Sequence, residues 1–228
     1  WTLDAYRNAG GYQSLARVLR DMTPEEVSDL VKESGLSGRG GAFFPTGLKW
    51  EFVRKDPKTP RYIVINGDES EPGTYVNRHS LELDPHLMLE GMIIAAYACN
   101  AELGYVYIRG EYGLAHDRAQ SAIREAYEAG YLGSDILGKT GFNFNVTFRR
   151  GAGAYIVGEE TALFNSLEGK RGNPRYKPPF PTNVGVWGMP TAINNVETLS
   201  AVPSIIERGA EWFQSLGRGE ATGTMMYC

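Results

Sequence analysis

The sequence is poor in cysteine and contains no long apolar segment. Among its 228 residues only Cys99 and Cys228 carry a thiol, and they lie far apart in the chain. Two distant thiols can build neither a disulfide framework nor a thiolate metal site, so we expect a reducing, cytosolic environment and no metal site. The longest apolar candidate, Met88 to Cys99, is interrupted by Glu90 and Gly91. It falls short of the roughly 18 residues of a membrane helix, and direct membrane insertion is not expected.

A strong charge of one sign is also missing. Lys and Arg number 23 against 27 Asp and Glu, which gives a net charge of −4 with both signs mixed along the chain. No basic stripe suited to nucleic acid is present. The histidines, His79, His86 and His116, share no metal-ligand spacing, and we expect them at the surface or at helix caps. Because no Ser-His-Asp or Cys-His arrangement is evident, demanding chemistry should come from a cofactor.

The two ends of the chain look incomplete. It begins at Trp1, shows no signal peptide, and stops after Met225, Met226 and Tyr227, which look like the start of a strand. We therefore expect a fragment of a longer polypeptide, in which residues 211–228 begin a further domain.

The sequence does contain a regular alternation of short apolar strands and helices. The first 34 residues are predicted to hold two short helices, the second started by a capping box from Thr23 to Glu26. Strands are then predicted over Arg61–Asn66, Tyr105–Arg109 and Phe144–Phe148, and helices over Leu48–Lys55, Asp84–Leu103, Ala115–Ala129, Glu159–Glu168 and Val196–Arg208. This alternation predicts an α/β fold with a parallel sheet flanked by helices, and ligands beyond the carboxyl ends of the strands.

The loop from Gly38 to Trp50 combines glycine with aromatic side chains. Glycines surround Arg39, and Phe43 and Phe44 follow. Consecutive amides in such a segment can bind an anion, and exposed phenylalanines suggest stacking on a flat ligand. The spacing is not GxGxxG, and a flexible surface loop is the alternative.

Two further loops are rich in carboxylates. Residues 149–160 follow a predicted strand, but Glu159 and Glu160 stand where a P-loop needs Lys and Ser or Thr. These glutamates could simply start a helix, or one of them could accept hydrogen bonds from sugar hydroxyls. Residues 66–73 could bind a cation, face the polar edge of a heterocycle, or form a solvated turn.

Five motifs in a fixed order resemble one family. They are SGLSGRGGAFFPTGLKW, INGDESEPGT, RGAGAYIVGEETALFNSLEG, NPRYKPPFP and NNVETL. Together they are similar to the 51-kDa-type flavoprotein of respiratory complex I, the NADH- and FMN-binding component of NADH:quinone oxidoreductases, over about Gly11 to Phe213. The resemblance implies a Rossmann-like domain over residues 35–210 that binds FMN and NADH without the usual fingerprint, preceded by the helical region of residues 1–34.

The resemblance also implies roles for individual residues. The FMN phosphate side would be formed by Gly38, Arg39, Gly41 and Lys49; the flavin and ribityl contacts by Asn66, Asp68, Glu69 and Ser70; the isoalloxazine wall by Tyr155, Gly158 and Glu159; and the rest of the FMN site by Asn194, Asn195 and Thr198. For NADH it implies adenine stacking by Phe44, Phe52 and Phe180, and polar contacts from Glu71, Glu160 and Lys177.

The implied activity is oxidation of NADH by hydride transfer to bound FMN, with electrons then passing to iron–sulfur clusters. No side chain is expected to act as acid or base. The family's four-cysteine motif for a 4Fe–4S cluster and its ubiquitin-like domain are not in this sequence. We expect that cluster only in a missing C-terminal part. The implied partners are a 2Fe–2S thioredoxin-like subunit and a large iron–sulfur subunit, in a peripheral arm on the cytoplasmic or matrix side of the inner membrane.

Some positions depart from the family pattern, and some alternatives share its chemistry. Phe43 stands where Gly is usual, Val157 where Cys is common, and Gly67 where Ala is common. A diaphorase subunit of a soluble NAD-linked hydrogenase or formate dehydrogenase would carry out the same reaction, although Ser70 favours the respiratory group. A subunit that has lost catalysis, or an unrelated sugar- or nucleotide-binding module, is disfavoured by the intact loops and the order of the motifs.

Overall fold

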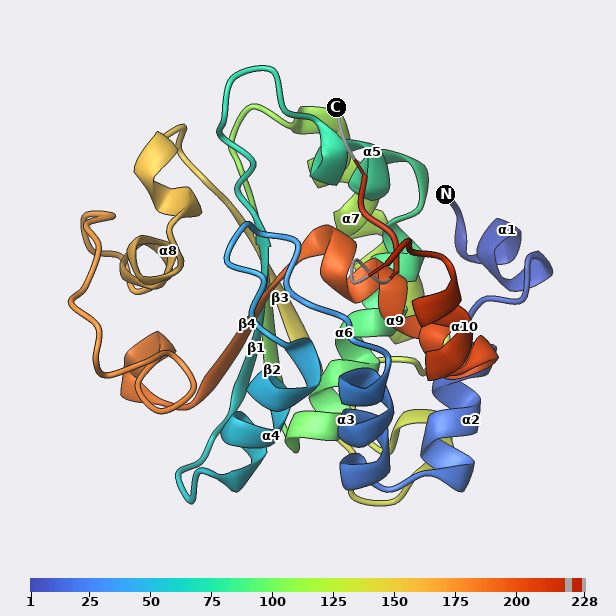
Figure 1. Ribbon diagram of the computed structural model, residues 1–228. Helices are drawn as coiled ribbons and strands as arrows, with labels where there is room; N and C mark the ends of the chain where they lie inside the picture. Colours follow the sequence, from blue (N-terminus) through green and yellow to red (C-terminus); the bar gives the residue numbers. More distant parts are fainter. Residues whose placement is uncertain (220–222, 227–228) are drawn as a thin grey trace.

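A four-stranded parallel sheet in the order β3-β2-β1-β4 organises the chain (Figure 1). The computed structural model describes residues 1–219 and 223–226. The strands are β1 (Tyr62–Gly67), β2 (Leu103–Ile108), β3 (Asn145–Arg150) and β4 (Thr191–Asn195). The predicted parallel α/β sheet is confirmed, and β4 is an addition to it. Its five residues contain only one large apolar side chain, Ile193, so the sequence carries no strand pattern there.

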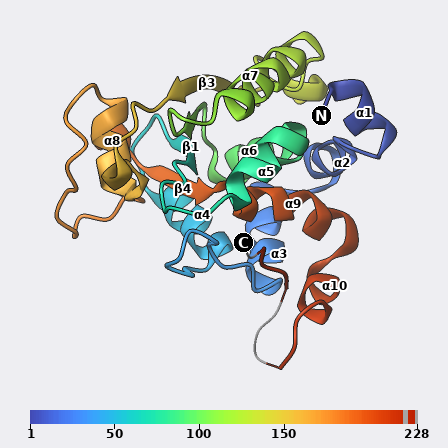
Figure 2. The same ribbon diagram turned by 90° about the horizontal axis from the view of Figure 1, so that it is seen from above.

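Helices cover both faces of the sheet. They are α1 (Leu3–Asn8), α2 (Gln13–Asp21), α3 (Pro24–Glu33), α4 (Thr46–Lys55), α5 (Val76–Leu83), α6 (Pro85–Cys99), α7 (Gly113–Glu128), α8 (Glu160–Leu167), α9 (Val196–Arg208) and α10 (Ala210–Ser215), with single 3₁₀ turns η1 (Ile136–Gly138), η2 (Tyr155–Gly158) and η3 (Val186–Gly188). Figures 1 and 2 place α8 on one face of the sheet and α6, α9 and the N-terminal helices on the other. None of the helices in the described residues is long and apolar enough to cross a membrane.

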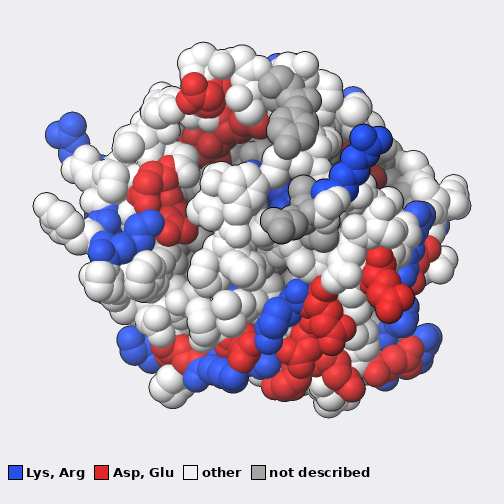
Figure 3. Space-filling view, in the orientation of Figure 1, with Lys and Arg blue, Asp and Glu red and all other residues white. Residues whose placement is uncertain are grey.

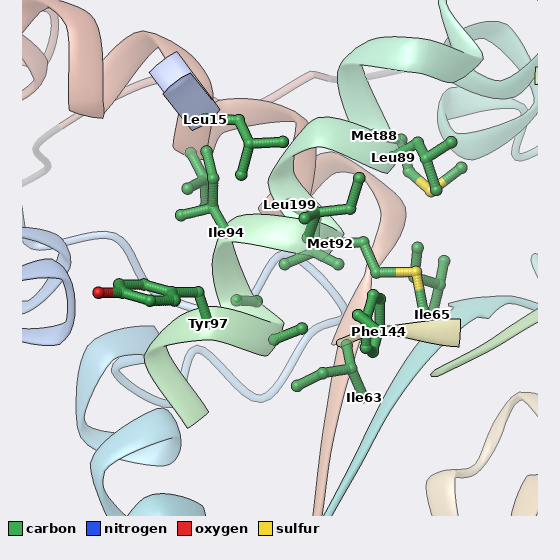
Figure 4. Packing of buried hydrophobic residues seen from close by; sticks show 14 of the residues in the cluster. Leu15, Ile63, Ile65, Met88, Leu89, Met92, Ile94, Tyr97, Phe144 and Leu199 are labelled. Atoms are coloured by element: carbon green, nitrogen blue, oxygen red, sulfur yellow. The ribbon is translucent and has the colours of Figure 1, made fainter. Parts of the chain in front are cut away.

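The larger core lies between the sheet and α6. Ile63 and Ile65 of β1 point into it, whereas their neighbours Tyr62 and Val64 belong to the smaller core under α8. This alternation is what a strand buried on both faces requires. Figure 4 shows Met92 of α6 among these side chains. The α6 and α9 backbones approach so closely that a Cβ at Gly91 would lie 2.0 Å from the Leu199 carbonyl oxygen.

Two helices begin with the local caps that the sequence predicts. The Thr23 hydroxyl accepts from the Glu26 amide at 3.3 Å, and the Glu26 carboxylate accepts from the Thr23 amide at 2.7 Å, so the capping box is confirmed. Asp84 caps α6 through the Leu87 amide at 3.4 Å. The prediction that this helix extends to residue 103 is wrong. Asn100 has a left-handed φ of 52°, which ends the helix and turns the chain into β2.

Two other helices receive their N-terminal caps from distant glutamates. Glu90 of α6 accepts from the amides of Tyr12 and Leu15 at the start of α2, both at 2.9 Å. Glu69, in the loop after β1, accepts from the amides at the start of α5. The local N-cap residue makes no side-chain cap in either helix. Without a local start signal α5 was not predicted, and residues 1–34 contain three helices where two were predicted.

One histidine lies in the interior, contrary to the sequence prediction. His86 is fully buried, with Nδ1 3.0 Å from the Tyr12 hydroxyl and Nε2 3.1 Å from a Glu125 carboxylate oxygen. Burial lowers the pKa of His86, although the Glu125 carboxylate acts to raise it. The hydroxyl and the carboxylate, supplied by segments far away in the sequence, make this interior position tolerable for an imidazole, and one sequence cannot show them.

The domain boundaries remain predictions. Tyr6, Leu15 and Val27 from residues 1–34 lie in the same core cluster as the sheet. Within residues 211–228, α10 ends at Ser215, and residues 224–226 carry no strand. The predicted strand therefore does not occur at Met225 and Met226. The rest of that prediction, residues 227–228 with the second cysteine, and residues 220–222 lie outside the described residues.

Candidate functional site

A cavity of about 730 Å³ opens at the carboxyl ends of β1 and β4. β1 pairs with β2 on one side and with β4, much later in the chain, on the other. The chain leaves these two strands towards different helices, which opens a crevice where ligands bind in such sheets. Asn66 at the end of β1 and Asn194 and Asn195 at the end of β4 form its floor. Its volume lies in the range of small-molecule sites.

The cavity gathers nearly all of the residues that the sequence singles out. It is lined by Gly38, Arg39, Phe44, Lys49, Asn66, Asp68, Glu69, Ser70, Glu71, Tyr155, Gly158, Glu159, Glu160, Lys177, Asn194, Asn195 and Thr198. Gly41, Phe52 and Phe180 do not line it. Arg39, Asp68, Glu160 and Asn194 come from separate segments and share this one hollow, as the predicted site requires.

One end of the cavity is glycine-rich and basic. The loop is closed by a bond from the Gly38 amide to the Phe44 carbonyl at 2.9 Å, and the Arg39 amide donates to Thr198 Oγ1 at 2.9 Å. Lys49 Nζ, at the start of α4, donates to the Ile193 carbonyl at 2.7 Å. An ammonium has three protons, so two stay available for a ligand. Burial lowers the pKa of Lys49, against the opposing charge of Glu160.

A tight acidic turn after β1 forms the next wall. The Asp68 amide donates to Asn66 Oδ1 at 3.1 Å, and Asn66 Nδ2 donates to the Gly158 carbonyl at 3.0 Å. The Ser70 hydroxyl donates to the Asp68 carboxylate. Burial raises the pKa of Asp68, and the bond from Ser70 acts against this. A Cβ at Gly158 would lie 3.0 Å from the Asp68 carbonyl oxygen, so glycine lets η2 pack on the turn.

The opposite wall carries paired charges. Glu159 is the N-cap of α8: one carboxylate oxygen accepts from the amides of Thr161 and Ala162, both at 2.9 Å. Burial alone would raise the pKa of Glu159, but these bonds and the ammonium of Lys177 hold it below its ordinary value. Lys177 Nζ lies 3.2 Å from Glu159 and 2.7 Å from Glu160. The helix-start interpretation therefore holds for Glu159, while Glu160 faces the cavity beside a lysine.

Exposed aromatic rings surround the mouth. Phe44 is 41% exposed and its ring centroid lies 6.3 Å from that of Phe52, which is 44% exposed. Phe43 lines the cavity at 53% exposure with a φ of 52°, a left-handed conformation for which glycine is better suited. Phe180 is 57% exposed. Large rings left accessible beside a polar hollow favour a flat ligand.

Several cavity residues were missed from the sequence. They are Gly40, Ala42, Thr74, Val76, Asn77, Ile156, Ile193, Glu197, Met225 and Met226. Asn77 Oδ1 accepts from Asn195 Nδ2 at 3.2 Å, but it lies on the unpredicted α5. Glu197 is buried and accepts from the Met226 amide at 2.8 Å, and burial raises the pKa of Glu197. Its place in NNVETL, at a helix start between Asn195 and Thr198, was a signal that could have identified it.

The described residues hold no group of three or more His, Cys, Asp or Glu that could bind a metal ion. Figure 3 shows acidic and basic side chains mixed over the face that it presents, without one uniform field. The cavity therefore offers amides, carboxylates, ammonium groups and aromatic rings, which is an inventory suited to holding an organic cofactor and a nucleotide.

Comparison with known proteins places the chain among flavin-binding subunits. Residues 31–204 match the model of the Nuo51 FMN-binding domain. The chain is 55% identical over 226 residues to an F-type NADH-quinone oxidoreductase subunit of Rhizobium meliloti, covering 99% of this chain and 53% of the relative. It is 51% identical over 225 residues to the corresponding protein of Escherichia coli, covering 98% and 50%. The chain thus spans about half the length of the curated relatives that it matches.

A solved structure shares the fold as well. The crystal structure of an NAD+-reducing NiFe hydrogenase in the H2-reduced state superposes with a TM-score of 0.86 at 36% identity. The match covers 98% of this chain and 38% of that chain.

Proposed function

The chain belongs to the Nuo51 FMN-binding domain family, and from this premise we propose that its cavity binds FMN and NADH so that NADH is oxidised. The relatives at 48–55% identity are named as subunits of NADH-quinone oxidoreductase. The observation that carries the proposal is the convergence of the glycine loop, the acidic turn and the end of β4 on one hollow.

The residues at the closed end suit FMN. A phosphate needs donors, and the glycine-rich loop at Gly38 and Arg39 lies in the same hollow as the ammonium of Lys49. An isoalloxazine ring needs flat walls without intruding side chains. Gly158 provides such a wall, because a Cβ there would already be tight against the turn at Asp68. Asn194 and Asn195 would complete the site with amide groups that can both donate and accept.

The mouth suits NADH. Phe44 lies at the rim with Phe52 beside it, and stacking of a base on such a ring is worth about 1–3 kcal/mol. We propose that Phe180 joins them on adenine. Glu71, Glu160 and Lys177 would contact the polar groups of the nucleotide, since carboxylates are good acceptors for ribose hydroxyls. We further propose that Gly41, outside the cavity lining, gives its loop the φ of +105° that shapes the phosphate side.

The protein's contribution to the reaction is geometric and electrostatic. Bound FMN supplies the acceptor for a hydride from NADH. The chain would hold the two rings in contact, which removes the entropic cost of bringing them together. The Glu159–Lys177–Glu160 group keeps its charges paired beside that contact. No acid or base is needed from the chain, in keeping with a cofactor that does the chemistry.

We also propose that the chain works inside a larger assembly. Its matched relatives are about twice as long, and the proposed 4Fe–4S cluster would lie in the part beyond this chain. A 2Fe–2S thioredoxin-like subunit and a large iron–sulfur subunit are the partners that we propose, in a peripheral arm on the cytoplasmic or matrix side of the inner membrane. The full function would be electron transfer from NADH towards a quinone.

One alternative has a specific observation behind it. The hydrogenase likeness fits a diaphorase subunit of a soluble NAD-linked hydrogenase or formate dehydrogenase, which would use the same cavity. Its 36% identity is lower than the 48–55% of the quinone oxidoreductase subunits, and we therefore favour the respiratory function. Purification of the native complex separates the two, because iron–sulfur and quinone-reducing partners or a hydrogenase would accompany the chain.

The test of the cofactor and donor is an absorption spectrum. The full chain is reconstituted with FMN, freed of unbound flavin, and titrated anaerobically with NADH and, separately, NADPH. Flavin bands that remain after desalting and bleach with NADH but not NADPH are the expected result. A chain that retains no flavin, or a bound flavin that NADH leaves oxidised, would overturn the proposal.

A further inference from the structure

The acidic turn of the proposed FMN site has little packed behind it. A second hollow of about 470 Å³ is lined by residues 70–75 together with Arg78, Arg109, Glu111 and Tyr112. Ser70, Glu71 and Thr74 border both this hollow and the main cavity. A segment between two hollows cannot be held in place by packing alone, since packing needs neighbours on each side. Its shape must come from hydrogen bonds.

Those hydrogen bonds converge on Glu69, the residue at the root of the segment. Its carboxylate accepts from the α5 amides of Asn77 at 2.9 Å and Arg78 at 3.1 Å, and from the Tyr112 hydroxyl at 3.1 Å. The side chain is buried and so directed towards α5 and α7. The resemblance implies that Glu69 contacts the flavin. In the structure its carboxylate is fully engaged in holding the turn.

Arg109 and Tyr112 fix the backbone of the same residue. Arg109 Nη1 donates to the Glu69 carbonyl at 2.5 Å, while its own amide donates to the Gly67 carbonyl at 3.2 Å. The Tyr112 hydroxyl lies 3.4 Å from the Glu69 carbonyl and 3.2 Å from that of Thr74. The guanidinium lies over the Tyr112 ring at 5.2 Å. Both residues come from the end of β2, on the far side of the turn from the main cavity.

Tyr112 keeps its proton at physiological pH. Burial, together with the charge of Glu69, raises the pKa of Tyr112 to about 12, against the lowering effect of Arg109. The hydroxyl therefore remains a donor to the groups on the turn. Neither Arg109 nor Tyr112 lines the main cavity, so neither is in a position to touch a ligand there.

We propose that Arg109 and Tyr112 are positioning residues that hold the Asp68–Ser70 turn in the shape that FMN binds. The inference rests on the proposed function, because it assigns these two residues to the site that FMN would occupy. Without the bonds to the Glu69 carbonyl, the turn can move into the second hollow. The binding-competent shape is then only one of several, and apparent affinity falls with its population.

The test compares variants of Arg109 with a matched arginine. Arg150 follows the neighbouring edge strand and likewise donates to a backbone carbonyl, that of Gly110, at 2.9 Å and 2.5 Å, but borders neither hollow. Full-length Arg109→Gln, Arg109→Lys, Tyr112→Phe and Arg150→Gln proteins are titrated with FMN. The Kd, the visible circular dichroism of the flavin at saturation, and the thermal midpoint are measured for each.

We expect Arg109→Gln to weaken FMN binding at least tenfold, which corresponds to about 1.4 kcal/mol, and to change the flavin dichroism at saturation. Arg109→Lys retains one charged donor and should recover part of both, Tyr112→Phe should lose about threefold in affinity, and Arg150→Gln should resemble the unsubstituted protein.

Arg109→Gln with unchanged flavin affinity and dichroism would overturn the inference, as would an equal loss in Arg150→Gln. A lower thermal midpoint with an unchanged flavin spectrum would show a structural role only, which also overturns it. If the unsubstituted chain binds no FMN, the proposed function itself fails, and the two failures are thereby distinguished.

Discussion

Replacement of Glu90 by leucine should remove much of the stability of the N-terminal region. Glu90 is buried and accepts three hydrogen bonds, from the Tyr6 hydroxyl at 2.5 Å and from the amides of Tyr12 and Leu15 at 2.9 Å each. Leucine has a similar size but no acceptor, so three buried donors lose their partner. Each orphaned donor costs about 1–3 kcal/mol, and with some relaxation we expect a loss of about 3–5 kcal/mol in total. That is a large share of the roughly 5–15 kcal/mol typical of a domain.

Glutamine provides an internal scale for this argument. Its single carbonyl oxygen can replace Oε2 and keep the bonds from Tyr6 and Tyr12, whereas its NH₂ group would face the Leu15 amide. We therefore expect Glu90→Gln to cost about 1–2 kcal/mol, between Glu90→Leu and the native protein. The exposed Glu207→Gln is the control and should stay within about 0.5 kcal/mol.

Urea unfolding followed by far-ultraviolet circular dichroism measures these free energies. A loss below about 1 kcal/mol for Glu90→Leu, or glutamine as damaging as leucine, would refute the assignment of the three bonds to Glu90.

Three further predictions concern other sites. Because burial lowers the pKa of His86 in the folded protein, the unfolded chain takes up the proton first; stability present above about pH 6.5 should fall below it, by up to about 1.4 kcal/mol per pH unit, and urea unfolding of His86→Gln at pH 7 and 5.5 should show a smaller difference. Gly158→Ala places a Cβ 3.0 Å from the Asp68 carbonyl oxygen; equilibrium dialysis should show FMN binding at least threefold weaker, with the thermal midpoint nearly unchanged. Lys49→Met removes the ammonium from the basic end and should weaken FMN about tenfold or more but riboflavin much less; equal losses in fluorescence titrations of the two flavins would contradict a phosphate contact.

The sequence was sufficient where a local pattern decides the structure. Three of the strands carry apolar β-branched runs, and the capping box at Thr23 starts α3 as predicted. The motifs also identified most of the cavity, because glycine, acidic turns and asparagines stand at the ends of successive strands. In a parallel sheet these ends meet at one edge, so linear motifs become spatial neighbours.

Features that depend on partners far away in the chain could not be predicted. β4 carries little apolar signal and is recognisable only through its pairing with β1. His86 is a buried residue because Tyr12 and Glu125 receive it. Glu69 belongs to a motif associated with flavin, yet its carboxylate holds α5 and Tyr112. In each case the decisive contact is formed by tertiary packing, to which propensity and spacing are insensitive.

The remote cap of α2 has a consequence for the timing of folding. The donors at Tyr12 and Leu15 wait for an acceptor that lies 78 and 75 residues further along the chain. A helix of nine residues without a local start signal is too short to persist alone in water. During synthesis the N-terminal segment should therefore stay unstructured on the ribosome until α6 has emerged. The first part of the protein to be made would be among the last to become ordered.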